Sequence, residues 1–186
     1  PPPPPAPPDW YAPPGGSASG HYGYPPYRPA QTRPAAVQLV EQEVAVRLNV
    51  QAGGQVEEAW YTLPGKMVLS AEGRPTGLAI TPAVEALASG EVRYLPGAWT
   101  VWHQASGYML STVPLPGEYQ AQELAGWLVG VTDWQKGLME IPEPAMQQAE
   151  AIVQRYVAGL RQGGAAAQRW KAWRNGDEQQ QQQQRS

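Results

Sequence analysis

The feature that most constrains the fold is a pair of stretches in which apolar and polar residues alternate, joined by the sequence AGGQ. In residues 44–51, valine or leucine occupies every even-numbered position, and the odd-numbered positions hold alanine or polar residues. A period of two is typical of a β-strand with one buried face. Residues 56–63, VEEAWYTL, continue after the glycine turn with Val56 and Trp60 on one face of a second strand. The two stretches predict a β-hairpin; its beginning stays open because residues 37–48 also fit a helical stripe.

A second hairpin is predicted in residues 99–113, WTVWHQASGYMLSTV. QASG suits a type I turn with Gly107 in the left-handed conformation, which pairs Trp102 with Leu110. One face then carries Thr100, Trp102, Tyr108, Leu110 and Thr112, and the other carries Trp99, Val101, His103, Met109 and Val113. Both faces are partly apolar, and one should pack against a helix. The other is either an aromatic platform for bases or a partner, or is covered by a C-terminal helix.

Leu-Pro-Gly occurs three times, beginning at residues 63, 95 and 115, and Pro-Gly suits the centre of a type II turn. The first two copies open similar stretches, which read as turn, strand, glycine turn, strand, proline, short helix and glycine. This pattern indicates tandem ββα units, unless only the turn residues recur. In the first unit, Thr81 caps a helix that begins at Pro82 and ends at Gly90.

Two longer helices and one short helix are predicted towards the C-terminus. Residues 118–131 and 144–161 place apolar side chains at helical spacing, and residues 165–174 follow a Gly-Gly pair. The longest stripe consists of Met146, Ala149, Ile152, Val153, Tyr156, Val157 and Leu160. The predicted fold class is therefore α+β, with antiparallel hairpins packed by C-terminal amphipathic helices.

The domain organisation follows from composition. Residues 1–35 hold thirteen of the 21 prolines and almost no aliphatic side chain, which predicts a disordered arm rich in Pro, Tyr and Gly. This arm is either a docking peptide for a protein partner or a spacer. The α+β domain is assigned to residues 36–162, a short basic-aromatic helix to residues 163–176, and a glutamine-rich disordered tail to residues 177–186.

The residue inventory disfavours most enzyme chemistry. The chain has no cysteine, two histidines and three aspartates, and one histidine lies in the arm. No clustered metal ligands, nucleophile with a base, or phosphate-binding glycine loop is visible. We therefore expect no enzyme, no cofactor and no metal ion. No stretch approaches the roughly 18 apolar residues that span a bilayer, so we expect no membrane insertion and a cytoplasmic location.

Charge divides the chain and suggests a binding surface. Residues 37–154 carry a net charge of −8, and residues 155–186 carry +4. Cations and flat rings together suit phosphates and bases, so we predict a non-catalytic adaptor that binds single-stranded or double-stranded nucleic acid. The alternative is a structural or assembly protein of a phage-like or mobile-element system, which uses the proline-rich arm and the aromatic sheet for protein contacts. The candidate binding residues are Arg155, Arg161, Arg169, Trp170, Lys171, Trp173 and Arg174, with Trp102 and Tyr108 on the sheet.

Overall fold

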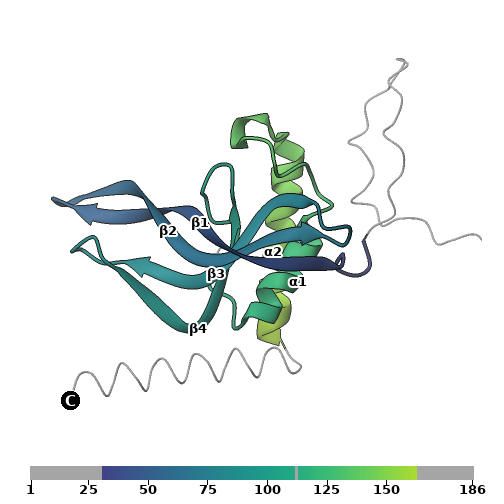
Figure 1. Cartoon of the computed structure of the whole chain (residues 1–186), viewed down its shortest axis with the longest axis horizontal. Coiled ribbons are helices and arrows are strands. Elements are labelled where there is room, and N and C mark those ends of the chain that lie inside the picture. Colours follow the sequence, from purple (N-terminus) through teal and green to yellow (C-terminus); the bar gives the residue numbers. More distant parts are fainter. Residues whose placement is uncertain (1–30, 112, 163–186) are drawn as a thin grey trace, which may run out of the picture. The chain divides into compact units, whose positions relative to one another are not determined.

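A four-stranded antiparallel sheet and two α-helices make up the described part of the protein (Figure 1). The computed structural model describes residues 31–111 and 113–162. The strands β1 (Val37–Ala52), β2 (Gln55–Ser70), β3 (Pro75–Ala86) and β4 (Val92–His103) lie in sequence order across the sheet. The helices are α1 (Glu118–Leu128) and α2 (Glu143–Gln162), with a 3-10 turn at Leu138–Glu140 between them. The predicted α+β class with C-terminal helices is confirmed. Most of the arm (residues 1–30), the fourth helix and the tail lie outside the described residues.

The hairpin of β1 and β2 is long and regular. All 16 residues of each strand pair without a register shift. The turn has positive φ at Gly53 and Gly54, 58° and 82°, which is the geometry that a two-residue hairpin turn needs. Val44 and Val46 are buried while Ala45 between them is exposed, so the predicted alternation is confirmed. The whole segment from Val37 is a strand, which excludes the helical alternative.

The Leu-Pro-Gly copies are not turns between strands, as the sequence suggested. The first lies inside β2, the second lies inside β4, and the third precedes α1. Gly65 of the first copy allows a close approach, since a Cβ there would lie 2.6 Å from the carbonyl oxygen of Ile80. Gly97 of the second has φ 72° and lies opposite the β3–β4 register shift between Pro82 and Val84. These glycines therefore shape the strands within the sheet.

The prediction of a helix after Thr81 is wrong, because residues 81–86 are the second half of β3. They pair with β4, from Thr81 opposite Thr100 onwards, and this ladder supplies non-local hydrogen bonds that local propensity does not encode. Pro82 costs little there. The pairing of β2 with β3 ends at Ile80, opposite Lys66. Since alternate residues face the same neighbouring strand, the N–H that Pro82 lacks would point past the end of that ladder. With no helix in the first unit, the tandem ββα hypothesis fails.

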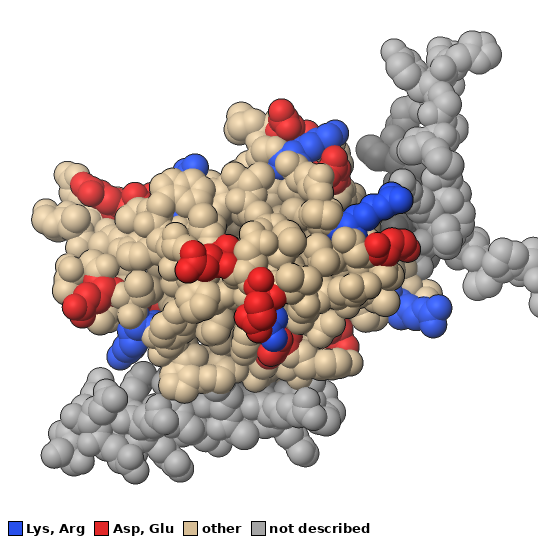
Figure 2. Space-filling model, in the orientation of Figure 1, with Lys and Arg blue, Asp and Glu red and all other residues tan. Residues whose placement is uncertain are grey.

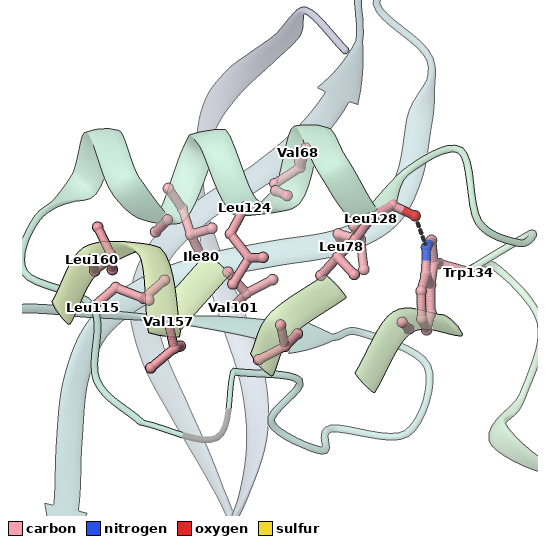
Figure 3. Close-up of a cluster of buried hydrophobic side chains, with 14 of the residues drawn as sticks. Val68, Leu78, Ile80, Val101, Leu115, Leu124, Leu128, Trp134, Val157 and Leu160 are labelled. Atoms are coloured by element: carbon pink, nitrogen blue, oxygen red, sulfur yellow. Dashed lines mark hydrogen bonds between the residues drawn. The ribbon is translucent and has the colours of Figure 1, made fainter. Parts of the chain in front are cut away.

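The larger core lies between the sheet and both helices (Figure 3). Leu124 and Leu128 of α1 are fully buried in one cluster with Ile80 and Val101 from the sheet. The Trp134 indole closes one end of the cluster, donating a hydrogen bond of 2.8 Å to the Leu128 carbonyl. The α2 stripe joins the same cluster through Ala149, Val153, Val157 and Leu160, which confirms both long helices.

The opposite face of the sheet curls around a smaller core that contains Trp102. This side chain is 1% exposed, and its indole N–H donates to the hydroxyl of Thr81 at 2.8 Å. The other buried members are Val44, Val46, Leu48, Leu63 and Ala79. Trp102 is thus covered by the β1–β2 hairpin. It is neither an open platform nor covered by the helix of residues 144–161, the two alternatives that the sequence had left open.

The hairpin predicted in residues 99–113 forms only in part. Gly107 has φ 73°, as expected, but Trp102 bridges Met109 instead of Leu110, and the segment after the turn makes only isolated bridges. A shift of one residue moves side chains to the other face. Leu110 accordingly packs against the larger core, while Tyr108 reaches the surface beside β1.

Candidate functional site

An exposed aromatic and charged cluster lies on the outer face of the β1–β2 hairpin. We call Arg47, Glu58, Trp60 and Tyr108 the Trp60 cluster. Arg47 and Trp60 are directly opposite each other in the ladder, so their side chains share one face. Nearer the start of β1 that face packs against the larger core beneath α1, where Leu39 lies opposite Val68. The residues of the Trp60 cluster do not belong to that core.

The Arg47 guanidinium stacks on two aromatic rings. Its central carbon lies 4.5 Å from the Trp60 ring centre and 4.9 Å from the Tyr108 ring centre, within cation–π range. The Tyr108 hydroxyl donates to the Glu58 carboxylate, with 2.9 Å and 3.0 Å to its two oxygens. Arg47 Nη1 donates to the Tyr108 hydroxyl at 3.2 Å and lies 3.5 Å from Glu58. Each of the four side chains is therefore held by at least one other.

The turn after β4 carries Tyr108 to the cluster, and it requires glycine. Gly107 has a positive φ, and a Cβ on it would lie 2.5 Å from the Trp60 ring. Its carbonyl oxygen accepts a hydrogen bond of 2.8 Å from the Arg47 backbone N–H. This bond joins the turn to the edge of β1, so the curl of the sheet also builds the cluster.

Trp60 is exposed and also in contact with neighbouring residues. The side chain is 54% exposed although Arg47 and Gly107 restrict it. Arg47 Nε is buried without a hydrogen-bond partner among the described residues. An unsatisfied buried donor costs about 1–3 kcal/mol, so the stack is maintained at some expense to stability.

The predicted binding residues have different fates. Tyr108 belongs to the Trp60 cluster, whereas Trp102 is a core residue and offers no surface. Arg155 and Arg161 lie on α2 and are exposed to solvent. The other five candidates, Arg169, Trp170, Lys171, Trp173 and Arg174, lie outside the described residues.

Three of the cluster residues were missed by the sequence interpretation, although a signal was available. A two-residue turn at Gly53-Gly54 places Ala52 opposite Gln55, and counting back along the strands pairs Arg47 with Trp60. Glu58 precedes Trp60 by two residues on the same strand and therefore lies on the same face. The position of Tyr108 beside Arg47 depends on the curl of the sheet and could not be predicted from the strand register.

His103 has a structural role. The ring is fully buried, and its Nε2–H donates to the carbonyl oxygens of Trp134 and Lys136 at 2.9 Å and 3.0 Å. Since Nε2 faces two carbonyl oxygens, the ring hydrogen is assigned to Nε2, and Nδ1 accepts from the Ser106 hydroxyl at 2.7 Å while that oxygen also accepts from the Tyr108 N–H. Both ring nitrogens are engaged in joining β4 to the 134–136 turn, so this histidine is packed in the core.

Other kinds of site have little support within residues 31–111 and 113–162. No group of three His, Cys, Asp or Glu side chains there could hold a metal ion, and no helix there could span a membrane. An open hollow of about 480 Å³ lies beside the C-terminal half of α2. It is lined by Val113, Gln154, Val157, Ala158, Arg161 and Gln162.

Comparison with known proteins does not assign a function. No family model matches the chain, and no curated protein or solved structure matches it either. The candidate site therefore has to be interpreted from its own geometry.

Proposed function

We propose that this protein is a non-catalytic binding protein that holds a protein partner through the Trp60 cluster. The observation that supports this most directly is the exposed indole of Trp60, which is stacked against the Arg47 guanidinium. Trp, Tyr and Arg dominate the hot spots of protein interfaces, and a side chain that is already ordered loses little freedom on binding. Val56, 62% exposed and on the same strand face, extends the apolar surface.

The charges around the cluster favour a protein over a nucleic acid. Residues 37–154 contain five Lys and Arg residues against thirteen Asp and Glu residues. The one cation in the cluster, Arg47, is already paired with Glu58. On the face that Figure 2 shows, acidic and basic side chains are scattered and form no basic patch. Phosphate backbones require concentrated cations, which this surface does not offer.

Binding of a protein partner is also what a structural or assembly protein, the alternative that the sequence suggests, would require. The proline-rich arm would add a second contact with a partner. Its first thirty residues lie outside the described residues, so the proposal rests on the Trp60 cluster alone.

The test is affinity capture with the full chain from a lysate of its own organism, followed by measurement of the captured partner's dissociation constant. We expect the Trp60→Ala chain to bind that partner at least about tenfold more weakly, since truncating a hot spot costs 2 kcal/mol or more. Tyr119→Ala is the matched control, because Tyr119 is 63% exposed on α1, away from the cluster. Equal binding by Trp60→Ala and the wild type would refute the proposal.

A second candidate function is nucleic-acid binding through residues 155–174. Arg155 and Arg161 are exposed on α2, and the sequence from residue 155 to residue 174 contains no acid. If about four phosphates are neutralised, the logarithm of the binding constant should fall with log salt at a slope of roughly −3 to −4.

Fluorescence anisotropy with single-stranded and double-stranded DNA and RNA tests this second candidate. Changing Arg169, Lys171 and Arg174 together to Ala should flatten the salt dependence. Changing Trp170 and Trp173 to Ala should weaken the binding of single strands more than that of duplexes, because stacking contributes about 1–3 kcal/mol per base. No binding at low salt would eliminate it.

A further inference from the structure

The outer edge of β1 before Arg47 is a second surface, distinct from the side chains of the Trp60 cluster. β1 is the first strand in the sheet order and pairs with β2 on one side only. In an antiparallel ladder, alternate residues direct their N–H and C=O groups to the same side. The Arg47 N–H bonds outward to Gly107, and the Val37 carbonyl accepts outward from the Gln122 side chain at 3.2 Å. The outward groups of β1 are therefore those of its odd-numbered residues.

Between these two anchors lies an open stretch, residues 39–45. No hydrogen bond from the described part of the chain reaches the outward N–H or C=O groups of Leu39, Glu41, Glu43 and Ala45. The last three of these residues are exposed. An unpaired strand edge of this length is a template for another extended segment.

The stretch is already in the conformation that strand addition needs. Its even-numbered residues, such as Gln42 opposite Gly65, belong to the uninterrupted ladder with β2. The Gly107 and Gln122 contacts hold the two ends. A partner strand would therefore bind a fixed edge, and only the partner would lose conformational freedom.

The charges identify the occupant. Glu41 and Glu43 lie on the open stretch, and the Glu41 side chain is 84% exposed although it lies 3.6 Å from Lys66. Antiparallel pairing of two copies over the whole stretch would be centred on Gln42, so Glu41 of each copy would lie opposite Glu43 of the other. Like charges directly opposite each other destabilise a sheet, which disfavours a second copy.

We propose that residues 39–45 of β1 bind an extended, cationic segment of a partner protein by strand addition. The outward N–H and C=O groups supply the hydrogen bonds. Lys or Arg at alternate positions of the partner segment faces Glu41 and Glu43.

The probe is a blocked seven-residue peptide of alternating lysine and valine, added to the full-length protein and followed by amide hydrogen exchange in NMR spectra. We expect the amides of Leu39, Glu41, Glu43 and Ala45 to exchange at least about tenfold more slowly at saturation, since they gain partners. The even-numbered amides should not change, because β2 already protects them. The same peptide with glutamate in place of lysine should not bind.

Two variants test the geometry and the charge separately. Ala45→Pro removes an outward N–H that β2 does not use, so the protein should fold and the peptide should no longer bind. The double variant Glu41→Gln with Glu43→Gln should bind the peptide about fivefold more weakly and with a smaller salt dependence. This variant is the test to use if the proline variant does not fold. Met139→Ala is the control that should leave peptide binding unchanged, because Met139 is 96% exposed in the 3-10 turn between α1 and α2.

Several results would overturn the proposal. Protection of odd-numbered and even-numbered amides alike, or of neither, excludes strand addition of the cationic peptide. Unchanged binding by the Ala45→Pro chain places the peptide elsewhere. A dimer that forms without peptide and is lost in Ala45→Pro would assign the edge to a second copy of the chain.

Discussion

Replacing Trp102 by alanine should destabilise the protein strongly, and replacing Trp60 should not. Both residues are tryptophans on strands of the same sheet, so the same atoms are removed in each case. Trp102 is 1% exposed inside the smaller core, and Trp60 is 54% exposed on the surface. The comparison tests whether the curl of the sheet buries Trp102.

The magnitudes follow from the burial. A buried tryptophan removes about 150–250 Å² from water, which at about 25 cal/mol per Å² corresponds to roughly 4–6 kcal/mol. Measured Trp→Ala substitutions in cores cost about 3–5 kcal/mol, so we expect about 4 kcal/mol for Trp102. The Thr81 hydroxyl would lose its indole donor but keep its bond to the Pro82 carbonyl. For Trp60 we expect about 1 kcal/mol, mainly from the lost stack on Arg47.

The assay is urea denaturation of the wild type and both variants, followed by far-ultraviolet circular dichroism. The difference in unfolding free energy between the two variants should be about 3 kcal/mol, with similar denaturant slopes. A cost below about 1 kcal/mol for Trp102→Ala, or equal costs for the two variants, would refute the assignment of Trp102 to the core.

Three further predictions concern single contacts. Gly107→Ala should cost about 1–2 kcal/mol in chemical denaturation and shift the fluorescence of Trp60, because its Cβ would overlap that ring at a positive φ; unchanged stability would contradict this. His103→Phe should cost about 2–4 kcal/mol by thermal unfolding, since it leaves the buried Trp134 carbonyl and the Lys136 carbonyl without their imidazole donor; a neutral effect would exclude that role. Burial, together with the hydrogen bond to Glu123, raises the pKa of Tyr156 above its usual value near 10. The unfolded chain releases that proton first, so stability should fall as the pH rises above about 10, and less so in Tyr156→Phe; identical pH profiles would refute it.

Local patterns were sufficient where the interactions themselves are local. The two-residue turn at Gly53-Gly54 and the alternation around it determine the β1–β2 register, and helical periodicity locates α1 and α2. Local patterns gave a wrong prediction at residues 81–90, where Thr81 and Pro82 resemble the start of a helix. The strand pairing with β4 that prevails there joins residues far apart in sequence.

The sequence by itself determined the α+β class, the main hairpin and the two amphipathic helices, because periodicity and turn chemistry act over a few residues. Only the tertiary structure decided that Trp102 is core and Trp60 surface, that Tyr108 joins Arg47 and Glu58, and that within the described residues nothing bonds to the outer edge of residues 39–45. Alternation separates the two faces of a strand, but it does not state what covers each face. That depends on how far the sheet curls, which is set by bulges, close approaches of the backbone and contacts between distant residues.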